Sequence, residues 1–151
     1  MTAMDRLGFL FHTPELLNHF RDVIDLLPPG SFDLVVCWDA ENSPDMRAAA
    51  QRWNANLVTT AEVLQSGRRY RFLVSNHPVQ VGPQPLIKDL AEKNVRFMYA
   101  AGKSGWNLSD WNRLYDLILC FGPFHAAAFG ECSDAVVLQM GYPRWKWRIH
   151  G

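Results

Sequence analysis

Short runs of continuous apolar residues alternate along this chain with stretches whose apolar residues recur at helical spacing. A strand that is apolar at nearly every position is typical of a sheet covered by helices on both faces, because neither face then meets water. Such strands alternating with helices indicate parallel pairing through helical crossovers. The pattern therefore predicts an α/β fold, a doubly wound and mostly parallel sheet of about six or seven strands with helices on both faces.

The boundaries of the elements follow from where each pattern starts and stops. Strands are predicted over residues 8–12, 32–38, 56–60, 70–75, 95–100, 116–121 and 135–140. Helices are predicted over residues 13–27, 45–53, 61–65, 85–93, 109–115 and 126–131. The first helix has the clearest start, since Thr13 suits the N-cap and Pro14 the first helical position. The length fits a single domain, which we assign to residues 1–143.

The composition argues against a disordered or membrane-spanning chain. Apolar residues make up 48% and charged residues 20%, as in a globular domain. No apolar run reaches the roughly 18 residues that a membrane span needs, and the N-terminus lacks the pattern of a signal peptide. The cysteines Cys37, Cys120 and Cys132 have neither disulfide-framework nor zinc spacing. We therefore expect a cytoplasmic protein, with peripheral attachment to the inner membrane face as a variant of that location.

Charge is unevenly distributed although the net charge is zero. Acidic residues concentrate in positions 1–46, and basic residues gather at 68–71 and 144–148. Two clusters this short fall below the basic footprint of a nucleic-acid-binding domain. We expect no nucleic-acid partner.

The second basic cluster alternates with two tryptophans. Trp145 and Trp147 follow the last predicted strand, where an isolated domain has little left to cover them. We expect residues 144–151 to begin an interdomain linker or a tail that contacts a second domain or another copy of the chain.

Polar side chains follow most of the predicted strands. Ligands of an open parallel sheet bind outside the carboxyl ends of its strands, so these positions are the candidate site. The candidate catalytic residues, which could act as a general base if burial or neighbours tune them, are His12, Asp39, Glu41 and His77. The candidate substrate-binding residues are Thr13, Asn76, Gly102, Lys103 and Gly122. The alternative for each is an ordinary role in shaping a loop.

Several familiar sites are missing from the sequence. No Gly-x-Gly-x-x-Gly follows the first strand, which argues against a dinucleotide site. Gly102-Lys103-Ser104 lacks the earlier glycine of a Walker motif, because position 97 is Phe. That tripeptide still offers backbone N–H groups and an ammonium to a phosphate. No group of residues has metal-ligand spacing, so we expect no metal and no cofactor.

Three segments near the end of the chain resemble a known family. They are residues 97–103, residues 115–123 and the turn Gly141-Tyr142-Pro143-Arg144, which is the most distinctive of the three. Together they resemble the end of the N-terminal domain in the CDP-glycerol glycerophosphotransferase family and related GT-B enzymes. The resemblance covers roughly a third of the chain.

The resemblance implies that the chain is the Rossmann-like, acceptor-side half of a GT-B glycosyltransferase or glycerophosphotransferase. Such an enzyme would act in the synthesis of bacterial surface polymers, with a glycan or polyol phosphate as acceptor. A second domain would hold the nucleotide-activated donor, and transfer would be metal-independent. The chain departs from the family pattern at Ala101, where the family has a histidine before the glycine. The base would then be vacant or be one of the four candidate catalytic residues.

Two other interpretations stay open. One is a domain like those of the sugar-nucleotide 2-epimerases. The other is a non-catalytic, flavodoxin-like or receiver-like module that binds a partner protein. A receiver requires an acidic pair after the first strand and an aspartate after the third, whereas this chain has His12-Thr13 and Thr60 there. The sequence therefore argues against a receiver-like module more than against a flavodoxin-like one.

Overall fold

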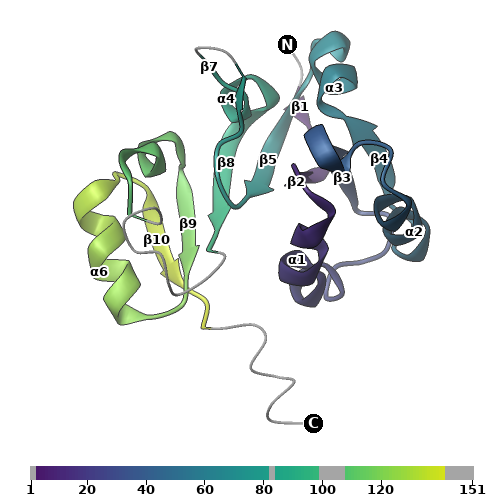
Figure 1. Cartoon of the computed structure of the whole chain (residues 1–151). Helices are drawn as coiled ribbons and strands as arrows, with labels where there is room; N and C mark the ends of the chain where they lie inside the picture. Colours follow the sequence, from purple (N-terminus) through teal and green to yellow (C-terminus); the bar gives the residue numbers. More distant parts are fainter. Residues whose placement is uncertain (1–2, 82–83, 99–107, 142–151) are drawn as a thin grey trace, which may run out of the picture.

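The computed structural model describes residues 3–81, 84–98 and 108–141. Its main sheet contains seven parallel strands in the order β10-β9-β8-β5-β2-β3-β4 (Figure 1). Their bounds are β2 Leu7–Phe11, β3 Phe32–Val36, β4 Asn56–Thr59, β5 Arg69–Ser75, β8 Ala91–Phe97, β9 Leu117–Cys120 and β10 Val136–Gln139. A short strand, β1 (Ala3–Met4), precedes β2 and pairs with β5 as well.

The strand order shows how the chain is wound. From β2 at the centre the chain adds β3 and β4 on one side, then crosses β2 to form β5 on the other side. It then continues outward through β8, β9 and β10. This is the doubly wound, Rossmann-like arrangement, whose direction reverses between β2 and β5. The predicted fold class is confirmed.

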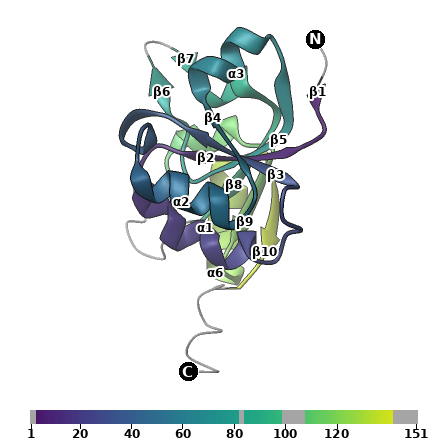
Figure 2. The ribbon, with the colours of Figure 1, turned by 90° about the vertical axis from the view of Figure 1, so that its right-hand side faces the viewer.

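Helices cover the two faces of the sheet with two separate cores (Figures 1 and 2). The helices α1 (Leu17–Ile24) and α2 (Pro44–Arg52) lie on one face, where Phe9 and Phe11 of β2 are buried. The helices α3 (Thr60–Ser66), α4 (Ile87–Leu90) and α6 (Pro123–Cys132) lie on the other, where Leu10 of β2 is buried. Successive residues of β2 thus enter opposite cores, which explains why the strand is apolar without interruption. Within the described ranges no helix could span a bilayer.

Several predicted helices are 3-10 turns or start later than expected. The first begins as a 3-10 turn, η1 (Pro14–Leu16), and the side chain of Thr13 makes no capping hydrogen bond. Residues 109–115 contain only a 3-10 helix, η3 (Asp110–Leu114). The predicted strand 32–38 ends at Val36, and the 3-10 turn η2 (Trp38–Ala40) follows.

The predicted helix over 85–93 is wrong in its second half. The helix α4 ends at Leu90, and Ala91 already pairs with Tyr70 as the first residue of β8. Tertiary pairing with β5 outweighs the helical spacing of the apolar residues there. The hairpin of β6 (Gln80–Val81) and β7 (Gln84–Pro85) was not predicted. The linker or tail predicted at 144–151 lies outside the described residues.

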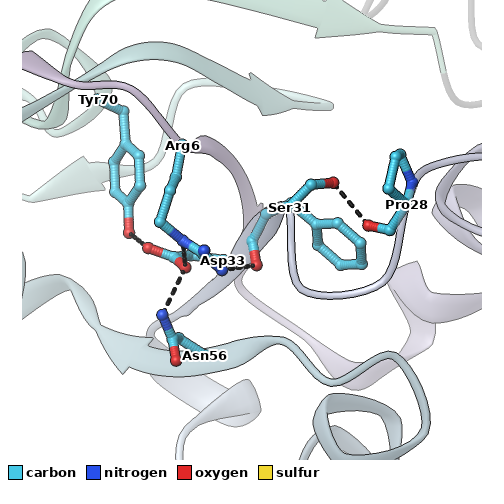
Figure 3. A network of polar contacts seen from close by, with 7 residues as sticks. Arg6, Pro28, Ser31, Asp33, Asn56 and Tyr70 are labelled. Atoms are coloured by element: carbon cyan, nitrogen blue, oxygen red, sulfur yellow. Dashed lines mark hydrogen bonds and ion pairs between the residues drawn. The ribbon is translucent and has the colours of Figure 1, made fainter.

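A polar network at the amino end of β3 joins four segments (Figure 3). The buried carboxylate of Asp33 accepts hydrogen bonds from Arg6 Nε at 2.6 Å, Asn56 Nδ2 at 3.1 Å and the Tyr70 hydroxyl at 2.8 Å. Burial, followed by the bond to Asp33, raises the pKa of Tyr70, so this hydroxyl remains a donor. Tyr70 reaches β3 by passing Gly8 of β2, where an added Cβ would lie 3.1 Å from its ring. The network fixes the alignment of the central strands at the end opposite to the candidate site.

Candidate functional site

The pairing of β2 with β5 places two of the predicted catalytic residues side by side. The ladder aligns Gly8 with Leu73 and Phe9 with Val74. His12 and His77 have the same sequence separation of 65 residues, so they lie level with each other just beyond the ends of these strands. Their Nε2 atoms are 3.2 Å apart. The pair therefore sits at the switch point of the sheet, where ligands of doubly wound folds bind.

The hydrogen bonds of His77 indicate which nitrogens carry protons. Its Nδ1 is 3.3 Å from the carbonyl oxygen of Pro78, which can only accept, so Nδ1 bears the proton. In a neutral ring His77 Nε2 is then an acceptor, and the proton between the two Nε2 atoms belongs to His12. Nδ1 of His12 then bears no proton and carries a lone pair, and it has no hydrogen-bond partner among the described residues. This nitrogen can accept a proton from a ligand.

Burial lowers the pKa of both histidines. For His12 the pKa falls from 6.5 to about 4, through burial first and the neighbouring His77 second, while the carboxylate of Asp39 acts in the opposite direction. For His77 burial again comes first, the bond to Pro78 opposes it, and the Arg96 guanidinium lowers the pKa further. Both rings are therefore neutral at pH 7, which is the form in which a histidine acts as a base.

These shifts predict that acid destabilises the fold through His12. In the unfolded chain His12 takes up a proton near pH 6.5, whereas in the folded chain it does so only near pH 4. Between these values the unfolded state binds more protons, so the free energy of unfolding falls as the pH falls. Because the ring is only half-buried, we expect its contribution to be about 1–2 kcal/mol. Urea unfolding of the wild type and His12→Gln at several pH values measures it. A loss between pH 7 and pH 4.5 that is equally steep in the variant would contradict the prediction.

Trp38 adds an exposed aromatic surface beside the pair. Its ring meets that of His12 edge-on, with centroids 6.0 Å apart, and 51% of the residue is exposed. Its backbone has φ of 50°, a left-handed conformation that is rare for a bulky residue and that is found preferentially at functional sites. Trp38 was predicted only as the last residue of the strand 32–38. The signal for a further role is that it is a large aromatic residue directly before the predicted polar loop.

Asn76 places a buried polar group next to His77. The residue is 5% exposed, and its Oδ1 has no hydrogen-bond partner in the part of the chain that the structure describes. A buried amide oxygen without a partner is costly, and a ligand hydroxyl or amine would satisfy it.

Arg96 supports the backbone at this point from the neighbouring strand β8. Its Nε donates to the carbonyl oxygen of Asn76 at 3.1 Å, and its Nη1 donates to Asn112 Oδ1 at 2.9 Å. The guanidinium lies over the rings of Trp111 and Phe129, at 4.4 and 5.1 Å from their centroids, and the side chain is fully buried. No role was predicted for Arg96, because it occurs within a predicted strand.

The remaining predicted residues occupy different positions. Thr13 is half-buried beside His12, and Asp39 is exposed but close enough to act on the charge of His12. Glu41 is exposed, and it adds to burial in raising the pKa of Cys37 to about 11, which keeps that thiol protonated. Gly122 follows β9, three strands from β2 and so about 14 Å across the sheet. Gly102 and Lys103 lie outside the described residues.

A groove of about 360 Å³ opens between α1 and α2. Its wall begins at Pro14, two residues after His12, and includes Asp45, which follows the loop that carries Asp39. Farther along the two helices it is lined by Arg21 and Arg52. The described ranges contain no cluster of three or more histidine, cysteine or acidic side chains that could hold a metal ion.

Comparisons with protein-family models, with curated proteins and with solved structures gave no match.

Proposed function

We propose that the chain is the acceptor-side half of a GT-B type transferase, and that His12 is its general base. The enzyme would pass a group from a nucleotide-activated donor, held by a second domain, to a hydroxyl of a glycan or polyol phosphate in bacterial surface-polymer synthesis. The observation that carries the proposal is the His12–His77 pair at the switch point, with His12 Nδ1 available as a proton acceptor.

In this reaction the acceptor hydroxyl gives its proton to His12 Nδ1. The hydroxyl oxygen forms the new bond to the transferred group, and the nucleotide leaves with the electrons of the bond that breaks. The imidazolium that forms is stabilised by the Asp39 carboxylate and by the hydrogen bond from its Nε2 to His77. Residues of this chain supply each of these contacts, so the proton transfer needs no metal.

Neighbouring residues suit an acceptor of this kind. The exposed ring of Trp38 offers an apolar surface for the C–H face of a sugar or polyol, and Asn76 Oδ1 offers an acceptor for one hydroxyl. Arg21 and Arg52 line the groove between α1 and α2 together with two acidic side chains, and the guanidinium groups would be the ones to pair with a phosphate of the acceptor. Together these residues offer contacts to the hydroxyls and to the phosphate of such a ligand.

The proposal predicts that the chain binds acceptor analogues and not the nucleotide part of the donor. In an NMR titration, glycerol 3-phosphate and methyl glycosides should shift the His12 ring and Trp38 indole signals. His12→Ala should weaken that binding by about tenfold or more, because it removes a hydrogen-bond acceptor from the site. Calorimetry with UDP, CDP and GDP should show no binding in the micromolar range.

His125→Ala is the matched control, since this histidine lies on α6 among Phe121, Phe124 and Phe129 and away from the switch point. Its affinity for the acceptor analogues should equal that of the wild type. Micromolar binding of a nucleotide at His12, with no response to the acceptor analogues, would overturn the proposed function.

A further inference from the structure

The strand β10 forms one edge of the sheet, since no described strand lies beyond it. On its inner side the N–H groups of Val136 and Met140 donate to carbonyl oxygens of the β9 segment, at 3.0 and 2.7 Å. Backbone groups of successive residues point to alternate sides of a strand, so the N–H and C=O groups of Val137 and Gln139 point outward. Such a row of outward groups is a template for a further strand.

One face of β10 is apolar and exposed. Val136 is 63% exposed and Leu138 is 51% exposed, whereas Val137 between them packs against the core that α6 covers. Figure 1 shows α6 beside β9 and β10, while α1 and α2 lie at the other end of the sheet, near β2, β3 and β4. A partner on this edge would remove the two exposed side chains from water.

The strand β4 at the opposite edge is better protected. Both α2 and α3 contact it, and its residues Leu57 and Val58 pack against the two cores. Edge strands are commonly shielded by charged residues, by proline or by a covering element. The sequence of β10 is Val-Val-Leu-Gln, which contains neither a charge nor a proline, and α6 packs against one of its faces. The β10 edge is therefore the one suited to pairing.

The outward side of β10 is complementary to a second copy of itself. When two β10 strands pair antiparallel around a two-fold axis at Leu138, Val137 of each chain is aligned with Gln139 of the other. The outward N–H and C=O groups of both residues then exchange hydrogen bonds across the axis. Leu138 lies opposite Leu138 of the second copy, and Val136 lies opposite Met140. Because the strand is uncharged, this pairing brings no like charges together.

We propose that the chain forms a symmetric dimer through β10, which joins the sheets of two copies into one continuous sheet. A pairing of four-residue strands is at the small end of specific interfaces, so we expect a Kd of about 10–100 µM. The edge lies four strands from β2, about 19 Å across the sheet, so the dimer leaves the His12–His77 pair open. The dimer goes beyond the proposed function and does not rest on it.

Sedimentation equilibrium of the intact chain at about 5 to 500 µM, which brackets the expected Kd, tests the dimer. Leu138→Lys places two ammonium groups opposite each other and should weaken association by about tenfold or more. Gln139→Pro removes an outward N–H and should weaken it similarly, since proline is tolerated where the N–H of an edge strand faces away from the sheet. Leu64→Lys is the matched control, because this leucine is 45% exposed on α3, and its association should equal that of the wild type. Circular dichroism shows whether each variant is folded.

A cysteine cross-link tests the alignment of the two strands. In the proposed pairing the two Leu138 residues form a non-hydrogen-bonded pair, whose Cα atoms lie about 4.5 Å apart, within the range that a disulfide spans. Leu138→Cys should therefore give a disulfide-linked dimer on oxidation, seen on a non-reducing gel. Gln139→Cys should give much less, because Gln139 lies opposite Val137. The wild type controls for the three native cysteines. This test remains decisive if the lysine or proline variant does not fold.

Three results would overturn the proposal. One is a wild type that stays monomeric over the whole concentration range, which would mean that the edge is covered by something other than a second copy. Another is association that the folded Leu138→Lys and Gln139→Pro variants both retain. The third is an associating protein in which Leu138→Cys forms no cross-link. None of these measurements involves an acceptor or a nucleotide, so their failure and the failure of the proposed function are distinguishable.

Discussion

Replacing Asp33 by alanine should lower the free energy of unfolding by about 2–4 kcal/mol. The carboxylate is buried and accepts hydrogen bonds from Arg6, Asn56 and Tyr70. Arg6 can turn to water, since it is partly exposed, but the hydroxyl of Tyr70 is enclosed and would lose its partner. Urea unfolding followed by circular dichroism measures the loss.

Asp5→Ala provides the matched control. Asp5 pairs with Arg71 at 3.2 Å, but both side chains are largely exposed, so its removal should change the free energy of unfolding by less than about 1 kcal/mol. In the Asp33→Ala background, Tyr70→Phe should cost much less than in the wild type, because it removes the orphaned hydroxyl. Equal losses for Asp5→Ala and Asp33→Ala would refute the structural role of the network.

Arg96→Ala should also destabilise the protein by about 3–5 kcal/mol. The change leaves a cavity between Trp111 and Phe129, and it removes the donors of Asn76 O and Asn112 Oδ1. Because Arg96 holds the backbone beside His77, the variant should in addition shift the ring signals of that histidine in NMR spectra. Thermal and urea unfolding together give the change in stability.

Lys93→Ala on the same strand is the control for Arg96. Lys93 is largely exposed, and its ammonium is 3.9 Å from Asp116, so we expect a change within about 1 kcal/mol and unchanged His77 signals. A folded Arg96→Ala variant with wild-type stability would contradict the prediction. It would show that the apolar surroundings replace the arginine without cost.

The sequence was sufficient to predict the architecture because its apolar runs are set by burial on both sides. β3 is buried at all five positions, a pattern that only a covered sheet requires. The ends of elements were less predictable. The segment 85–93 has the apolar spacing of a helix, but its last residues pair with β5. Such pairing depends on residues distant in sequence, which a local pattern does not contain.

The candidate site was partly predictable for the same reason. The general rule for parallel sheets selected His12 and His77, because both follow strands. It could not predict that they would be neighbours, which requires the strand order and the register of β2 with β5. Trp38 and Arg96 were missed, because the role of each depends on contacts across the fold.

The register of the central ladder has a consequence for how this chain tolerates insertions and deletions. The pairing of β2 with β5 aligns residues that are 65 apart in this sequence, and this alignment brings His12 and His77 together. The strand pairing sets the alignment, and it does not require a particular length of the loops between the two strands. Loops between them could therefore lengthen or shorten while the pair stays intact, provided that both strands keep their alignment. A single residue deleted within β2 or β5 would instead slip the ladder and turn one histidine toward the opposite face. Proteins that share this site should therefore differ in the length of the segment between the two strands. They should keep the number of residues from Gly8 to His12 and from Leu73 to His77 constant.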